Sequence, residues 1–130
     1  LGFVPQEELL TYYANSDFFV FASSCENLPI TLLEAMATGL PVACSDRGPM
    51  PEVLQGGGVY FDPENAISIA SAVEKIINDK DLRSSISKRA KELALIYSWK
   101  RCASETWSFL ANICRYKTWN DVSHHHHELP

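Results

Sequence analysis

The sequence lacks several features that define common classes of protein. None of its four cysteines form a CxxC pair, so neither a zinc ribbon nor a thioredoxin-like site is expected. No apolar run approaches the roughly 20 residues of a membrane-spanning helix. The chain has 130 residues and no initiating Met, and we therefore expect one domain that belongs to a longer protein.

Basic residues are scarce in the first half of the chain. Residues 1–65 contain nine acidic residues and a single basic one, Arg47, whereas residues 66–130 carry a net charge of +3. The overall net charge of −5 argues against a nucleic-acid-binding surface. An anionic ligand bound by the first half would need positive charge from elsewhere.

The composition is that of a folded domain. Hydrophobic residues make up 46% of the chain and charged residues 21%, which excludes disorder for most of its length. Cys25, Cys44 and Cys102 lie in apolar or strand-like contexts. We therefore expect reduced, buried thiols and a reducing, cytoplasmic environment.

The pattern of apolar and turn-forming residues predicts a parallel α/β fold. Buried strands are predicted over 18–22 and 40–44, and a short third strand over 59–61. Helices are predicted over 6–14, 29–38, 52–54, 65–78, 80–96 and 98–113. The first strand is a continuous apolar run and is predicted to be buried on both faces. Strands that alternate with helices are typical of a parallel sheet with crossover helices. Because three strands are few for such a domain, we expect earlier strands before Leu1.

The helical pattern stops beyond Cys114. We therefore divide the chain into a domain over residues 1–113 and a flexible tail over residues 114–130. Four consecutive histidines, His124–His127, are interpreted as a low-complexity segment or an expression remnant rather than a metal site. Trp99 and Trp107 are expected to anchor the core.

Glu34 is the only charged residue between Asn27 and Ser45. Its predicted helix is otherwise nearly all apolar, and a buried carboxylate must be paired or hydrogen-bonded. One interpretation is structural: Glu34 accepts hydrogen bonds from backbone amides, or it pairs with a distant Lys or Arg. The other is functional: Glu34 lies in a cleft and accepts hydrogen bonds from a vicinal diol such as that of a ribose.

The position of this helix supports the functional interpretation. It follows a buried parallel strand, so its N-terminus points to the carboxyl edge of the sheet, where ligands of open α/β sheets bind. Unpaired amides near residues 27–31 would form an anion site there. A diol acceptor beside an anion site indicates a nucleotide-type ligand.

Glu26 and Glu34 stand in an E-x7-E relation. The segments Ala22–Glu26, Leu33–Ala43 and Pro51–Val53 lie around them, and two further segments are Leu1–Pro5 and Tyr97–Trp99. Together these segments resemble the nucleotide-sugar-binding signature of retaining GT-B glycosyltransferases, in particular glycosyltransferase family 4. The resemblance covers residues 1–113.

The resemblance implies the Rossmann-like, C-terminal donor-binding domain of a two-domain GT-B enzyme. It implies that Glu34 binds the nucleotide ribose, and that Glu26, the candidate catalytic residue, lies near the hydroxyls of the donor sugar. The further substrate-binding candidates are residues whose backbone amides would face the sugar and the diphosphate: Asn27, Leu28, Ile30 and Thr31. The family's diphosphate-binding Arg and Lys would precede Leu1, in agreement with the shortage of basic residues.

The implied reaction is the transfer of a sugar from a nucleoside diphosphate sugar to a glycan or lipid-linked acceptor, with retention of anomeric configuration. It would need no metal and no other cofactor, and it would serve polysaccharide biosynthesis. Two alternatives remain open. One is a GT-B-type nucleotide-sugar epimerase, and the other is a non-catalytic nucleotide-binding or structural fragment.

The expected partners are the nucleotide-sugar donor, the acceptor and a missing N-terminal acceptor domain, and no nucleic acid is expected. The full-length enzyme is expected in the cytoplasm, with a peripheral association at the inner face of the membrane. The 130-residue piece is expected to be inactive by itself, because catalysis in this fold takes place between two domains.

Overall fold

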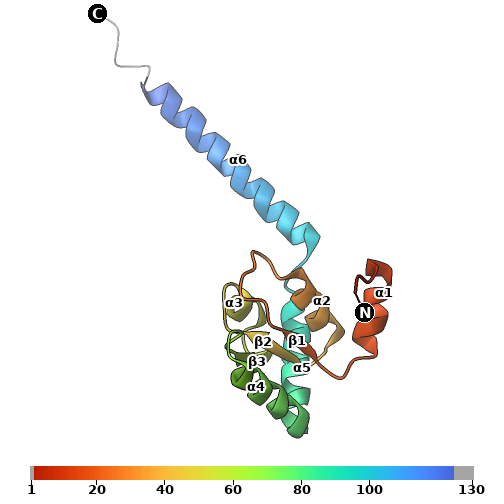
Figure 1. The fold of residues 1–130 in the computed structure, drawn as a ribbon. Coiled ribbons are helices and arrows are strands. Elements are labelled where there is room, and N and C mark those ends of the chain that lie inside the picture. The colour runs from red at the N-terminus through yellow and green to blue at the C-terminus, as the bar shows by residue number, and fades with distance from the viewer. Residues whose placement is uncertain (1, 125–130) are drawn as a thin grey trace, which may run out of the picture. The chain divides into compact units, whose positions relative to one another are not determined.

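The structure is a computed structural model that describes residues 2–124, including the side chains of residues 2–115. The chain divides into two units, residues 1–96 and residues 97–130. The larger unit is built on three strands: β1 (Phe19–Phe21), β2 (Val42–Ser45) and β3 (Gly58–Phe61). They form a parallel sheet in the order β1-β2-β3 (Figure 1), which confirms the predicted α/β class.

Within the described part of this unit, five helices accompany the sheet. They are α1 (Gln6–Ala14), α2 (Ile30–Thr38), α3 (Met50–Leu54), α4 (Ala66–Asn78) and α5 (Lys80–Ala94). Local signals explain their ends. Gly39 adopts the left-handed conformation (φ 82°) that terminates α2. The Asn65 side chain accepts hydrogen bonds from the amides of Ile67 and Ser68 and so caps α4.

The central strand separates two hydrophobic clusters, because alternate side chains of a strand point to opposite faces. Val42 and Cys44 pack with side chains of α2, α3 and α5 on one face. Ala43 packs with α4 and Phe61 on the other. The helix α5 contributes to both clusters. The sheet is therefore covered on both faces at β2, and this rigid layer holds the loops that follow the strands.

Among the three cysteines expected to be buried, Cys44 alone is buried. Burial raises the pKa of its thiol to about 12, so the thiol stays protonated near neutral pH. Cys25 and Cys102 are exposed, so the prediction was wrong for them. Their apolar sequence neighbours do not cover them, because Cys25 lies in a surface loop and Cys102 on a helix whose described side chains are almost all exposed.

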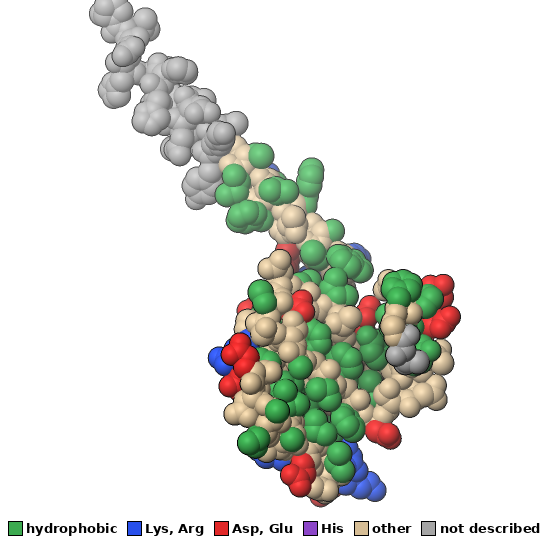
Figure 2. All heavy atoms as spheres, in the orientation of Figure 1, with side chains coloured by type: hydrophobic (Ala, Val, Ile, Leu, Met, Phe, Trp, Pro, Cys, Tyr) green, Lys and Arg blue, Asp and Glu red, His purple; other side chains and the backbone are tan. Residues whose placement is uncertain are grey.

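The strand β1 forms one edge of the sheet, and its burial is incomplete. Val20 is 39% exposed, so the prediction of burial on both faces was wrong. Val20 shares a face with Ala43, but the cluster around α4 draws on β2, β3 and Phe18 and does not include Val20. Figure 2 shows hydrophobic side chains gathered on the visible face of this unit.

The helix α1 packs beside α2 (Figure 1). Tyr13 of α1 is buried with Ala35 and Leu40, and its ring meets Phe19 edge-on, with centroids 5.9 Å apart. This small third cluster fixes α1 against the first strand–helix pair. It thereby brings residues near the start of the chain to the side of α2.

The smaller unit contains one long helix, α6 (Trp99–His124). The Ser98 hydroxyl oxygen accepts a hydrogen bond from the Arg101 amide at 3.1 Å, as expected of an N-cap. The helix continues past Cys114, where its end was predicted, because its backbone hydrogen bonds are local and need no apolar face. The segment 125–130, and with it most of the histidine run, lies outside the described residues.

Trp99 and Trp107 are not core anchors. They are 78% and 75% exposed, and the expectation was therefore wrong. Their spacing places them on an apolar helix face, but periodicity alone does not determine whether anything covers that face. Among the described residues, no helix combines the length and the apolar character that crossing a membrane requires.

Candidate functional site

Three loops follow the three parallel strands and therefore lie at the carboxyl edge of the sheet. They comprise residues 22–29 after β1, 46–49 after β2 and 62–65 after β3. The first two loops adjoin each other: a Cβ atom added at Gly48 would lie 3.8 Å from the carbonyl oxygen of Glu26. Gly48 has a φ of 52°, which favours glycine. The structure thus places the half-buried Glu26 at this edge.

The N-terminus of α2 carries no side-chain cap. Pro29 precedes the helix and makes no capping hydrogen bond. Within the described residues, the backbone amides of Asn27, Leu28 and Thr31 donate no hydrogen bond, so these donors are available to a ligand. Their role in an anion site stays a prediction. The Ile30 amide differs, because it donates to the carbonyl of Leu28 at 2.9 Å. The contact of this amide with a ligand stays a prediction.

Glu34 lies about 6 Å farther along the axis of α2 than Ile30, which is just over one turn. Its carboxylate is half-buried. Oε1 accepts a hydrogen bond from the Gln6 side-chain amide at 3.3 Å, and Oε2 accepts one from the Tyr13 hydroxyl at 3.2 Å. The partners are therefore two side chains of α1, and not the backbone amides or the distant cation of the structural interpretation.

Two contacts leave this carboxylate with acceptor capacity. An ionised carboxylate has about four lone-pair positions, and Gln6 and Tyr13 occupy one on each oxygen. The donor from Tyr13 is reliable near neutral pH. Burial chiefly, and then the negative charge of Glu34, raises the pKa of the Tyr13 hydroxyl, so it stays protonated.

Sequence reasoning missed Gln6 and Tyr13 as neighbours of Glu34. The signal available was weak: Tyr13 shares the apolar face of the predicted first helix, and a buried tyrosine hydroxyl usually needs a polar partner. Nothing local identifies that partner, which is 21 residues away.

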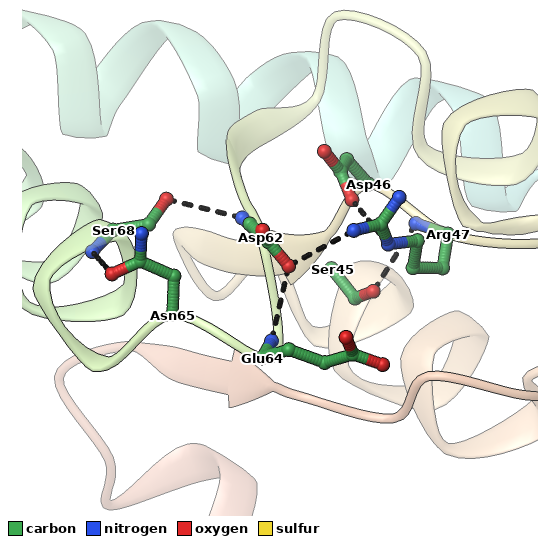
Figure 3. A network of polar contacts seen from close by, with 7 residues as sticks. All are labelled: Ser45, Asp46, Arg47, Asp62, Glu64, Asn65 and Ser68. Carbon is green, nitrogen blue, oxygen red and sulfur yellow. Dashed lines mark hydrogen bonds and ion pairs between the residues drawn. The ribbon is translucent and has the colours of Figure 1, made fainter.

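The single basic residue of the first half is engaged by carboxylates (Figure 3). The guanidinium of Arg47 lies 3.3 Å from Oδ1 of Asp46 and 3.1 Å from Oδ1 of Asp62. The Glu64 amide also donates to Asp62, and chiefly for this reason, with Arg47 contributing, the pKa of Asp62 is held below its usual value. Arg47 joins the loops after β2 and β3, and the edge as a whole remains acidic.

Other described surfaces of the larger unit are weaker candidates for a functional site. A hollow lined by residues of α4 and α5, including Glu74, Lys75 and Asp81, lies away from the loops that follow the strands. Among the described residues, no three His, Cys, Asp or Glu side chains are grouped so that they could hold a metal ion. The carboxyl edge and the adjoining face of α2 therefore form the candidate site.

Comparisons with known proteins agree on one family. The family model described as "Glycosyl transferases group 1" matches residues 1–93. The chain is 34% identical over 106 residues to the O-antigen chain mannosyltransferase B of Escherichia coli, covering 82% of this chain and 28% of that protein. The chain spans between 21% and 28% of the length of the first three curated relatives it matches.

The fold also occurs in solved structures. Sucrose-phosphate synthase from Thermosynechococcus elongatus matches with a TM-score of 0.78 and 24% identity, covering 89% of this chain and 30% of that one. The C-terminal domain of a glycosyl transferase group 1 family protein from Francisella tularensis matches with a TM-score of 0.66 and 28% identity, covering 74% of this chain and 51% of that one. The expectation of a GT-B type of fold is thereby confirmed.

Proposed function

The chain belongs to the glycosyl transferases group 1 family, and from this premise we propose that it forms part of the donor site of an enzyme that uses a nucleoside diphosphate sugar. In this proposal the sugar passes to a glycan or lipid-linked acceptor with retention of anomeric configuration, as glycosyltransferase family 4 enzymes do. A glycan acceptor is consistent with the name of the Escherichia coli relative, an O-antigen chain mannosyltransferase.

The observation that carries the proposal is the Glu34 carboxylate. It is half-buried beside an uncapped helix N-terminus and retains acceptor positions for a ligand. A ribose presents two adjacent hydroxyls that one carboxylate can accept together. The diphosphate would then lie toward the amides at the start of α2, where the helix dipole favours negative charge.

The charge of the diphosphate sets a further requirement. The nearby carboxyl edge contains Glu26, Asp46, Asp62 and Glu64, and its one basic residue, Arg47, already contacts two of these carboxylates. Helix amides alone seldom bind a diphosphate without Arg or Lys. We therefore infer that basic residues that precede Leu1 complete the donor site, and that a separate N-terminal domain holds the acceptor.

The remaining roles follow from the same proposal. Glu26, beside the loop after β2, would contact the hydroxyls of the donor sugar as the candidate catalytic residue. The residues that would offer backbone amides to the sugar and the diphosphate are Asn27, Leu28, Ile30 and Thr31. The full-length enzyme would act in the cytoplasm, with peripheral association at the inner face of the membrane.

The isolated 130-residue chain is expected to show no sugar transfer, because the acceptor side of the site would be missing. Its uncovered β1 edge should also promote self-association. Nucleoside diphosphate release from UDP-, GDP- and ADP-sugars, measured for the chain and for the full-length protein, tests both the function and this expectation. The proposal is supported if the full-length protein turns over one of the donors and the isolated chain does not. Robust transfer by the isolated chain contradicts the two-domain site.

Transfer by the full-length enzyme is expected to be independent of divalent metal. In this proposal, helix amides and basic side chains take the diphosphate charge that a metal ion takes in other transferases. Turnover measured before and after treatment with EDTA should agree within about twofold, a spread of well under 1 kcal/mol. A large loss of rate that Mg²⁺ or Mn²⁺ restores would show that this part of the proposal is wrong.

A further inference from the structure

The hydroxyl of Tyr13 is held in place by its own ring. Tyr13 is only 8% exposed, and the ring packs against Phe19, Ala35 and Leu40. A tyrosine side chain has two rotatable torsions before the ring, so burial of the ring leaves the hydroxyl little freedom. The hydroxyl reaches Oε2 of Glu34 at 3.2 Å. A fixed donor on α1 therefore meets a carboxylate on α2.

Gln6 makes a different kind of contact with the same carboxylate. Its amide donates to Oε1 at the longer distance of 3.3 Å, and its side chain is exposed to water. A ligand hydroxyl can replace Gln6 without leaving a buried polar group unpaired, because water then satisfies the released amide. A ligand hydroxyl that displaced Tyr13 would instead leave the hydroxyl of a buried tyrosine without its partner.

We propose that Tyr13 is a positioning residue that holds the Glu34 carboxylate, through Oε2, in the orientation that accepts the ribose hydroxyls of the donor nucleotide. This inference rests on the proposed function and adds a residue to it. Gln6 occupies Oε1 in the absence of ligand and gives way to a ribose hydroxyl. Tyr13 keeps its contact in both states, so the carboxylate is oriented before the nucleotide arrives and loses little conformational entropy on binding.

The test uses Tyr13→Phe in the full-length protein, which removes the hydroxyl and keeps the ring. Tyr12→Phe is the matched control: it removes the hydroxyl of the neighbouring, exposed tyrosine, which makes no side-chain hydrogen bond among the described residues. Calorimetric titrations would use UDP, GDP and ADP, followed by the 2′-deoxy form of whichever diphosphate binds most tightly. Thermal unfolding of every variant shows whether it is folded.

Tyr13→Phe is expected to weaken binding of the ribonucleotide by about threefold to tenfold, since one hydrogen bond orients the carboxylate. Binding of the 2′-deoxy nucleotide should change less, so the preference for ribose falls. This preference is a readout that a merely structural role would not move. In the double variant Tyr13→Phe/Glu34→Gln, the fold loss of nucleotide affinity should be smaller than the product of the two single fold losses, because Tyr13 acts through Glu34.

The outcomes distinguish a failure of the Tyr13 role from a failure of the proposed function. Unchanged affinity and unchanged ribose preference in a folded Tyr13→Phe protein, with the wild type binding nucleotide, overturn the role of Tyr13 alone. Equal losses for Tyr12→Phe and Tyr13→Phe overturn it as well. A wild-type protein that binds none of the three diphosphates overturns the proposed function, and the inference fails with it.

Discussion

Replacing Glu34 by Gln in the full-length protein is expected to weaken binding of the nucleoside diphosphate by about tenfold to a hundredfold, and binding of the sugar donor equally. The variant removes the charge that strengthens the hydrogen bonds from the ribose hydroxyls, a loss of about 1.5–3 kcal/mol. Calorimetric titration with the diphosphate that the wild type binds most tightly measures the effect.

The structure indicates that Glu34→Gln should remain folded. The amide oxygen of Gln can still accept from the Tyr13 hydroxyl, and its NH₂ group can donate to the side-chain oxygen of Gln6. Glu74→Gln, on the exposed surface of α4, removes an equal charge and is the matched control. If a folded Glu34→Gln protein binds the diphosphate as tightly as the wild type does, Glu34 has no ribose role.

Glu26→Gln should behave differently, because Glu26 is assigned to the donor sugar and not to the nucleotide. Its affinity for the nucleoside diphosphate should stay within about twofold of the wild-type value, while turnover of the complete donor falls at least about tenfold. Steady-state kinetics beside the same titrations separate the two glutamates. Equal loss of diphosphate affinity in both variants would contradict the division of roles.

Gly58→Ala is expected to destabilise the chain by at least about 3 kcal/mol, the upper end of the range for overpacked cores. Gly58 begins β3, and a Cβ atom there would lie 2.6 Å from the carbonyl oxygen of Val42 and 2.6 Å from Cδ2 of Leu54. The carbonyl belongs to the paired strand β2, so it cannot retreat without loss of the ladder. Thermal unfolding followed by circular dichroism should show a midpoint lower by about 12 °C or more.

Gly56→Ala is the control, because apart from its chain neighbours no heavy atom lies within 4 Å of the position of its Cβ. It should change the free energy of unfolding by about 0.5 kcal/mol or less. The comparison isolates the packing between β2, β3 and α3 from any general effect of removing a glycine. Similar midpoints for the two variants would show that the close approach at Gly58 is absent in solution.

Much of the local structure could be predicted from the sequence, because the signals are local. Asn65 caps α4 through amides two and three residues away, and Gly39 ends α2 by its own backbone conformation. Predictions of burial were less successful. Val20 and Trp99 have the sequence context of buried residues and are exposed, since burial depends on which other elements cover a face.

For the candidate site too, some features follow from the sequence and others only from tertiary packing. The sequence by itself determined that Glu34 is an isolated charge on an apolar helix and that basic residues are nearly absent around it. It also predicted an anion site at the start of that helix. The tertiary structure alone decided the partners of Glu34. Gln6 and Tyr13 lie 28 and 21 residues away, and they reach the carboxylate because α1 packs on α2 through Tyr13, Ala35 and Leu40. Hydrogen bonds between distant residues follow from such packing, which no local pattern of residue types encodes.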